Sequence, residues 1–243
     1  MLKSKAWMIF TWVFFTLSAV NIIALNIPVE QGVFTSQNYL FNVLTKPLIM
    51  ASALYYLMKY LTHQEFHNWL LVAFLYSFLG DVLLMGQGIN ELFFVGGLGA
   101  FFIAQGAYIV YFYRSAGSWY SPNRSIRILQ GVVVLFSIGL YSLMLPNLGV
   151  LWIPVLLYLT IVASMGIVAL GRLGRVNFNA FTYTTIGAFS FILSDSIIGY
   201  NKFVDEIPFA GSLIMVFYCF AQYMILKGFI ALQAQESPEP LRT

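Results

Sequence analysis

Apolar segments of about 20 residues recur along the chain and limit what it can fold into. Each is long enough to cross a bilayer core of roughly 30 Å as a helix. We count eight, which run approximately over Trp7–Leu25, Tyr39–Tyr60, Trp69–Met85, Leu92–Tyr113, Ile126–Leu145, Val150–Leu170, Tyr183–Tyr200 and Phe209–Leu232. The sequence therefore predicts an all-α fold, a polytopic bundle of eight transmembrane helices.

Composition supports one membrane domain. Hydrophobic residues make up 60% of the 243 residues and charged residues 9%, far below the globular average of about 25% charged. The longest polar stretch, Arg114–Arg127, is only the size of a loop. We predict a single transmembrane domain over residues 1–232 and a disordered polar tail over residues 233–243. The single cysteine, Cys219, lies in an apolar run and is interpreted as a buried structural thiol.

The basic residues predict the orientation of the helices in the membrane. With eight spans and the N-terminus inside, the outer loops carry only Lys202, and both termini are cytoplasmic. The inner segments carry Lys3, Lys5, Lys59, Arg114, Arg124, Arg127, Arg172, Arg175, Lys227 and Arg242. Because the net charge of +3 is small and these residues are spread over several short loops, nucleic acid is excluded as a partner.

Three charged residues, Lys46, Asp81 and Asp195, lie within the outer halves of the predicted spans. Asp81 and Asp195 follow the similar segments Ser77-Phe78-Leu79-Gly80 and Ser190-Phe191-Ile192-Leu193-Ser194. At 1.5 Å per residue, both aspartates fall roughly 7 Å below the outer interface, and Lys46 falls roughly 10 Å below it. Intramembrane charges are costly and tend to pair or to line a wet cavity. We therefore expect the three side chains to meet in one polar pocket near the outer leaflet.

The two halves of the chain show a weak internal repeat. The aspartate segments align, as do Phe102-x-Ala104-Gln105 with Phe220-Ala221-Gln222, and Pro47 with Pro154. A four-helix offset preserves orientation, so a true duplication would relate the halves by an axis along the membrane normal. A 4+4 parallel repeat remains open beside chance similarity of common membrane residues.

Other polar residues admit a structural reading beside a functional one. Lys46 could snorkel to the interface without pairing. Buried hydroxyls and amides need partners, so they either cross-link helices or line the pocket; these are Gln105, Tyr108, Tyr158, Tyr218 and Gln222. His63 and His67 have the spacing of a metal pair but no third ligand, which favours a solvated turn. We predict no metal site and no cofactor.

An ordered set of short motifs resembles the YhhN family of lysoplasmalogenase-like membrane proteins. The motifs are Lys46-Pro47-Leu48, Gly80-Asp81, Gly97-Leu98-x-x-Phe101, Gly187-Ala188-x-x-Phe191-x-x-Ser194-Asp195, Asn201-x-Phe203, Tyr218 and Gln222. The resemblance implies a multi-pass enzyme, in a bacterial inner membrane, that hydrolyses the vinyl ether bond of lysoplasmalogens. The released products would be a fatty aldehyde and a glycerophospho-ethanolamine or -choline. The family pattern commonly has histidine where this chain has Gln105, so rate or substrate could differ.

The residues suit that chemistry. Vinyl ether cleavage begins by protonating an alkene carbon, which gives an oxocarbenium ion that water captures. Two carboxyl groups in different protonation states could supply the acid and stabilise the developing charge, as in glycosidases. We assign Asp81 and Asp195 as catalytic. We assign Lys46, Gln105, Tyr108, Tyr158, Asn201, Tyr218 and Gln222 as supporting or substrate-binding, with Lys46 holding one aspartate ionised or binding the lipid phosphate.

The partner implied is a single-chain ether phospholipid whose chain lies among Phe101, Phe102, Phe189 and Phe191, together with surrounding membrane lipids. The main alternative is a proton- or ion-coupled transporter of a small molecule or lipid. The helices lack the paired Gly/Pro interruptions of discontinuous transporter segments, and the polar groups lie shallow, which favours the enzyme. A lipid-binding relative without catalytic activity is a third reading. The sequence leaves the oligomeric state open.

Overall fold

The computed structural model describes residues 2–26, 37–61, 66–86, 88–117 and 124–236. Over these ranges the chain forms eight α-helices, two short 3₁₀ turns and no strand. The elements are α1 (Leu2–Asn26), α2 (Gln37–Tyr60), α3 (His67–Met85), α4 (Glu91–Ala116), α5 (Arg124–Met144), η1 (Leu145–Asn147), η2 (Gly149–Leu151), α6 (Trp152–Gly171), α7 (Phe178–Phe203) and α8 (Ala210–Glu236). The predicted all-helical fold is confirmed, and the expected helix bounds differ from the observed ones by at most five residues.

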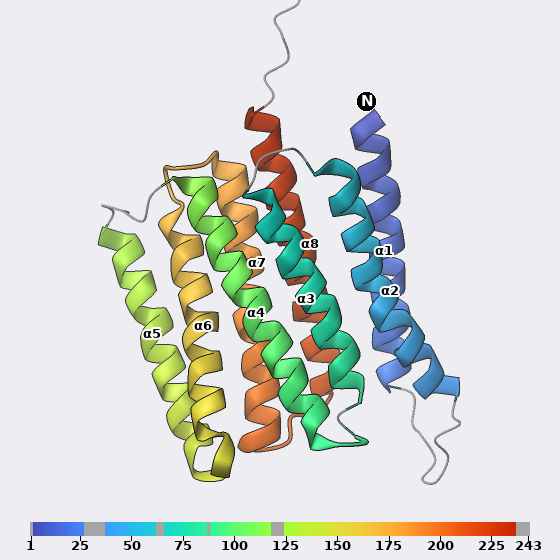
Figure 1. The fold of residues 1–243 in the computed structure, drawn as a ribbon, viewed down its shortest axis with the longest axis vertical. Coiled ribbons are helices and arrows are strands. Elements are labelled where there is room, and N and C mark those ends of the chain that lie inside the picture. The colour runs from blue at the N-terminus through green and yellow to red at the C-terminus, as the bar shows by residue number, and fades with distance from the viewer. Residues whose placement is uncertain (1, 27–36, 62–65, 87, 118–123, 237–243) are drawn as a thin grey trace, which may run out of the picture.

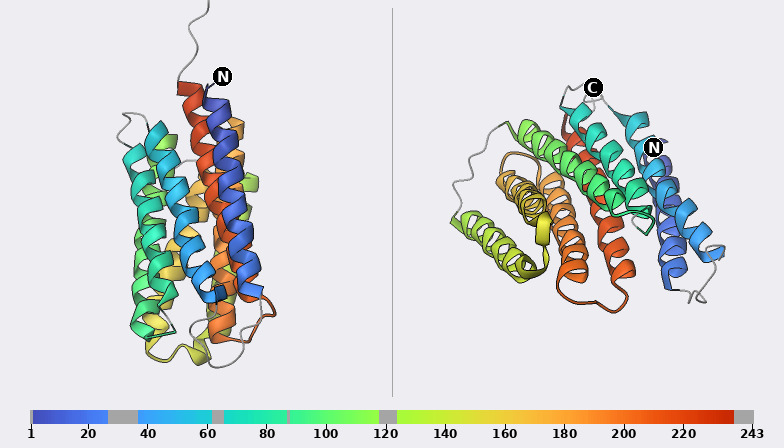
Figure 2. Two further views of the ribbon diagram at one scale, coloured as in Figure 1. Left: turned by 90° about the vertical axis from the view of Figure 1, so that its right-hand side faces the viewer. Right: turned by 60° about the horizontal axis from the view of Figure 1, so that its bottom comes forward.

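The long helices lie side by side in one bundle (Figures 1 and 2). Helix α7 packs most extensively on α8, and α3 packs on α4. The pair α1 and α2 forms one edge of the bundle and α5 the other (Figure 1). Helix α1 begins and α8 ends at the same end of the bundle, whereas the α3–α4, α5–α6 and α7–α8 connections lie at the opposite end. We call this opposite end the hairpin end.

Local sequence signals set several helix ends. Asn90 caps α4 by accepting a hydrogen bond from Leu92 N at 2.8 Å, and Asn177 caps α7 by accepting one from Ala180 N at 2.7 Å. Helix α4 ends at Gly117, whose φ of +73° is the left-handed conformation that glycine adopts without a steric penalty. Pro146 cannot continue a regular helix, and the chain passes through the two 3₁₀ turns after α5.

Seven of the described helices are long and apolar enough to cross a membrane. The eighth helix, α2, contains Lys46 and Pro47 and is not among these seven candidate membrane spans. The chain is thus a multi-pass helical membrane protein by length and composition, and a span by α2 stays a prediction. The orientation of the termini and the internal repeat also stay predictions.

The C-terminal helix is longer than expected. Helix α8 continues through Glu236, whereas the sequence analysis begins the polar tail at residue 233. The Gln233 amide is 7% exposed and its Nε2 donates to the Tyr60 carbonyl at 2.7 Å, which joins the last turn of α8 to the end of α2. Residues 237–243 of the predicted tail lie outside the described residues.

Glycines allow close approach between packed helices. A Cβ at Gly97 on α4 would lie 2.6 Å from Leu84 Cδ2 on α3, so this glycine lets the two helices pack closely. A Cβ at Gly187 on α7 would lie 2.9 Å from the Ala221 carbonyl oxygen of α8. The obstacle at Gly187 is backbone, which cannot rotate away.

We therefore expect Gly187→Ala to destabilise the protein by about 1–3 kcal/mol, because the added methyl group forces α7 and α8 apart. The measurement is thermal unfolding of the purified protein in detergent. Gly139→Ala on α5 is the matched control, since a Cβ there meets no atom within 4 Å. Equal unfolding temperatures for Gly187→Ala and the wild type would contradict the close packing.

Candidate active site

Asp81 belongs to a buried ion pair. Its side chain is 2% exposed, and Lys46 Nζ on α2 lies 3.4 Å from its Oδ1. The Tyr218 hydroxyl on α8 donates to Oδ2 at 2.6 Å. We call these three residues the ion-pair cluster. Since the Lys46 side chain is 16% exposed and contacts Asp81, it pairs with an intramembrane aspartate as expected, and snorkelling alone does not describe it.

The position of Asp81 depends on the residue before it. Gly80 has no side chain, and a Cβ there would lie 2.6 Å from Phe101 Cδ2. The Phe101 ring of α4 therefore packs directly on the backbone of α3, one residue from Asp81. This contact explains why a glycine precedes Asp81, because a side chain at position 80 would collide with the Phe101 ring.

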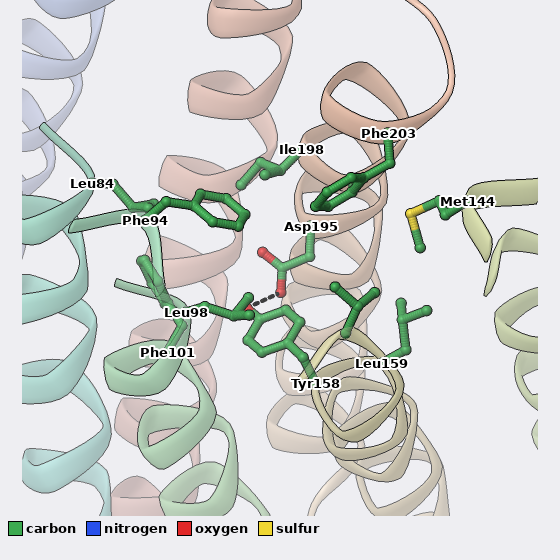
Figure 3. A pocket seen from close by; sticks show the side chains of 12 residues that line it. Leu84, Phe94, Leu98, Phe101, Met144, Tyr158, Leu159, Asp195, Ile198 and Phe203 are labelled. Atoms are coloured by element: carbon green, nitrogen blue, oxygen red, sulfur yellow. Dashed lines mark hydrogen bonds between the residues drawn. The ribbon is translucent and has the colours of Figure 1, made fainter. Parts of the chain in front are cut away.

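Asp195 lies in a different environment, the wall of a cavity (Figure 3). The Tyr158 hydroxyl of α6 donates to its Oδ2 at 2.8 Å. The space, which is partly open to the outside, is about 540 Å³, and among the described residues Asp195 and Tyr158 are the only polar side chains that line it. Its apolar wall is formed by Leu84, Phe94, Leu98, Phe101, Met144, Val155, Leu159, Ile198 and Phe203, with Gly199. We call this space the acid cavity.

The acid cavity lies near the hairpin end of the bundle. Its lining comes from the end of α3, the beginning of α4, the end of α5, the beginning of α6 and the last turns of α7. All of these meet at the hairpin end in Figure 1. Asp81, four residues before the end of α3, lies toward the same end. The similar membrane depth of the two aspartates stays a prediction.

The two aspartates do not form a contacting pair. Among the described residues, the polar contacts of Asp81 are with Lys46 and Tyr218, and the hydrogen bond of Asp195 is with Tyr158. Helix α3 packs on α2 and α4, whereas α7 packs on α8 and α6. This arrangement differs from the single pocket that the sequence suggested: the carboxyl groups occupy two neighbouring centres.

Aromatic rings lie between the two centres. The Phe101 ring lines the acid cavity, and its centroid is 5.9 Å from that of Tyr218 in the ion-pair cluster. Phe191 on α7 completes the group, with its centroid 6.2 Å from Phe101 and 5.5 Å from Tyr218. These edge-to-face contacts hold the two centres at a fixed separation.

Further polar side chains lie beside these rings. The Tyr108 hydroxyl on α4 donates to Gln222 Oε1 on α8 at 2.6 Å. Gln105 lies one turn before Tyr108, is fully buried and faces the Tyr158 hydroxyl. Ser77 on α3 is also fully buried and faces the Tyr108 hydroxyl. Thus Gln105, Tyr108, Tyr158, Tyr218 and Gln222 all lie at or between the two centres.

Several other expectations differ from the structure. Asn201 belongs to neither centre, because its Oδ1 accepts from the Ile207 backbone N at 2.8 Å and so fastens the loop after α7. Phe102 is 37% exposed and does not line the acid cavity. His67 is fully buried against Phe229 rather than solvated, and His63 lies outside the described residues.

The cavity wall was largely missed by the sequence analysis, although α4 carries a signal for it. Phe94, Leu98, Phe101, Gln105 and Tyr108 are spaced by three or four residues, which places them on one face of a helix. Following that stripe from Gln105 back to Phe94 would have predicted the α4 wall. Met144 and Phe203 come from other helices, and their place depends on tertiary packing.

The arrangement combines an acid with an apolar binding space. A carboxyl group whose surroundings are mostly apolar can hold a proton and deliver it to a bound apolar molecule. A buried carboxylate beside an ammonium group can stay ionised and accept a proton from a polar neighbour. The two centres therefore have the features of an acid and a base.

Comparisons with known proteins agree with the residue pattern. The model of the YhhN family matches residues 41–229. Lysoplasmalogenase TMEM86A of Bos taurus is 31% identical over 176 residues, and that of Homo sapiens is 32% identical over 176 residues. Each alignment covers 70% of this chain and 66% of the relative, so the chain matches slightly less than two thirds of each relative's length. No solved structure matches this chain.

Proposed function

The chain belongs to the YhhN family, and we propose that it hydrolyses the vinyl ether bond of a single-chain alkenyl phospholipid. The products would be a fatty aldehyde and a glycerophospho-ethanolamine or -choline. The observation that carries the proposal is Asp195, a carboxyl group in the wall of an otherwise apolar cavity. The named activity of the TMEM86A relatives supports the same reaction class.

The acid cavity suits an alkenyl chain in its lining, because its aromatic and aliphatic walls match a hydrocarbon chain. Its two polar groups, on Asp195 and Tyr158, lie together on one side. A chain held against the apolar wall would therefore present its ether end to Asp195.

In the proposed reaction, Asp195 gives its proton to the alkene carbon next to the chain. The resulting oxocarbenium ion is attacked by water, which forms a hemiacetal and loses a proton. The hemiacetal then collapses to the aldehyde and the glycerol hydroxyl. The Tyr158 hydroxyl donates to the Asp195 carboxylate as it forms, which stabilises the negative charge in the transition state. One water is consumed, and the proton that it loses replaces the one that Asp195 gave.

Asp81 serves in this proposal as the ionised partner. Lys46 and Tyr218 each contact one of its oxygens, and both contacts favour the charged carboxylate. Lys46 thus holds an aspartate ionised, and the alternative role of binding the lipid phosphate is not required. The separation of the two carboxyl groups allows one to be neutral while the other is charged.

The function is tested with purified protein in detergent and a panel of single-chain lipids. We expect fatty aldehyde from an alkenyl lysophospholipid and none from its acyl ester analogue, as measured by mass spectrometry. Accumulation of an intact substrate in sealed proteoliposomes would instead identify a transporter. Saturable lipid binding with no product would identify a lipid-binding protein without activity.

Tyr158→Phe is expected to lower kcat about tenfold to a hundredfold, because it removes a hydrogen bond to a carboxylate formed in the transition state. The ring remains, so the cavity wall and KM should change little. Tyr141→Phe is the control, since the Tyr141 hydroxyl donates to the Trp152 carbonyl outside the cavity. An unchanged kcat in Tyr158→Phe would remove this hydroxyl from the mechanism.

A further inference from the structure

The polar faces of three helices meet between the ion-pair cluster and the acid cavity. On each helix two polar residues lie three or four positions apart and so share a face. The pairs are Ser77 and Asp81 on α3, Gln105 and Tyr108 on α4, and Tyr218 and Gln222 on α8. Hydrogen bonds from Tyr218 to Asp81 and from Tyr108 to Gln222 join α8 to both α3 and α4. The three faces therefore enclose one polar centre within the apolar core.

This centre contains more hydrogen-bonding atoms than the described side chains satisfy. The Ser77 hydroxyl, both polar atoms of the Gln105 amide and Nε2 of Gln222 are buried and make no hydrogen bond with any described residue. Their side chains are all 0% exposed. Gln105 and Ser77 face tyrosine hydroxyls without reaching hydrogen-bonding geometry. Buried polar groups in folded proteins almost always have partners, so four such atoms in one place require one.

The atoms indicate what that partner is. They include amide donors, an amide acceptor and a hydroxyl that can act as either, so a ligand must both donate and accept. The side chains that carry these atoms are fully buried, so the partner must be small. Water meets both requirements, and a buried water typically makes about three hydrogen bonds. A metal ion is a poor match, because the unsatisfied atoms include amide N–H groups, which donate hydrogen bonds and cannot ligate a cation.

We propose that Ser77, Gln105 and Gln222 bind the water that hydrolyses the substrate, and that this water links the two carboxyl groups. The proposal rests on the proposed function for the fate of the water, but the binding site itself follows from the side chains. Gln105 lies one turn before Tyr108 on α4 and close to the Tyr158 hydroxyl, so it is the side chain that connects the polar centre to the acid cavity. Gln105 is accordingly a positioning residue for water.

Because the bound water connects the two carboxyl groups, the proton that Asp195 gives up can be replaced by one from the water. Asp195 protonates the alkene carbon, and the oxygen of the bound water forms a bond to the oxocarbenium carbon. The water proton passes through the hydroxyl groups of the polar centre, the last of them on Tyr218, to the Asp81 carboxylate, which becomes neutral. The same proton then returns to Asp195, and the hemiacetal collapses with no net change in either carboxyl group. No other reactant is needed.

The water site is tested first without substrate, by X-ray hydroxyl-radical labelling and mass spectrometry. Bound water yields radicals that oxidise the side chains beside it, even where those side chains are buried. We expect Tyr108, which is 0% exposed, to be oxidised several-fold faster than Tyr56, which is 5% exposed but packed between Trp7 and Phe10. Oxidation of Tyr108 as slow as that of Tyr56 would overturn the proposal.

Single-residue variants then test which side chains bind the water. Gln105→Leu and Gln222→Leu keep the approximate volume but remove the amides, and each is expected to slow Tyr108 oxidation several-fold. Gln130→Leu is the matched control, because Gln130 donates to the Ile167 carbonyl near the opposite end of the bundle. Elution and thermal unfolding show whether each variant is folded. Folded Gln105→Leu protein with Tyr108 oxidation equal to the wild type would exclude Gln105 as a water ligand.

The kinetic consequence is measured separately. We expect Gln105→Leu to lower kcat about tenfold with KM nearly unchanged, because water positioning affects the chemical step and not lipid binding. A rise in KM with constant kcat would place Gln105 in lipid binding and overturn its role with water. If the wild type releases no aldehyde, the proposed function fails, whereas the labelling result still decides whether water is bound.

Discussion

Asp195→Asn is expected to lower the rate of aldehyde release by about a hundredfold to ten-thousandfold, the usual contribution of a general acid. This corresponds to about 3–5 kcal/mol of transition-state stabilisation. The amide is nearly the same size as the carboxyl group, so it can fill the same place beside Tyr158 in the acid cavity. It cannot protonate an alkene carbon. The loss should therefore appear in kcat, with lipid binding and the unfolding temperature nearly unchanged.

The measurement is initial-rate kinetics of aldehyde release, with lipid binding determined in parallel. Asp205→Asn is the control, because Asp205 is exposed in the loop after α7 and its Oδ1 accepts a hydrogen bond from the neighbouring Glu206 N, away from the acid cavity. Retained activity in a folded Asp195→Asn protein would refute the assignment of Asp195 as the acid. The proposed function would survive that result only with another proton donor.

Lys46→Met is expected to destabilise the folded protein by about 3–5 kcal/mol, since it leaves Asp81 buried without its cation. The Asp81 side chain is 2% exposed and cannot recover its hydration. The double variant Lys46→Met/Asp81→Asn removes both charges and should regain most of the lost stability, because the amide can still accept from Tyr218. The double variant should nonetheless be inactive, since it lacks the ionised carboxylate.

Thermal unfolding in detergent, completed as a double-mutant cycle, measures the coupling between the two residues. Lys59→Met on the same helix is the control, because Lys59 is exposed near the end of α2 and its recorded contacts with described residues are with the faces of Tyr55 and Tyr60 at about 6 Å. Additive losses in the cycle would show that Lys46 and Asp81 do not stabilise one another.

Much of the axial arrangement could be predicted from the sequence. Apolar segment length gives the helices, and a rise of 1.5 Å per residue gives the depth of a side chain along each one. Lys46 and Asp81 were placed near one membrane level by this arithmetic, and the structure joins them in an ion pair.

The lateral arrangement could not be obtained in the same way. Depth does not reveal which helices are neighbours or which way a residue faces across the bundle. Asp81 and Asp195 are predicted to share a level, yet Phe101 and Phe191 lie between their centres, because α3 packs on α4 whereas α7 packs on α8. Gly80 indicates locally that another group packs closely before Asp81, since only a residue without a side chain leaves space for the Phe101 ring. The sequence does not reveal that this group is Phe101, because the contact depends on how α4 packs on α3.

The place of the acid cavity near the hairpin end has a consequence for what happens after the bond breaks. The two fragments differ in solubility: the aldehyde keeps the hydrocarbon chain and would diffuse into the bilayer, while the charged glycerol phosphodiester would leave into water. It would leave on the side opposite the start of α1 and the end of α8 (Figure 1). In the orientation predicted from the basic residues, that side is outside the cell, and the cell would have to import the polar fragment before reusing it.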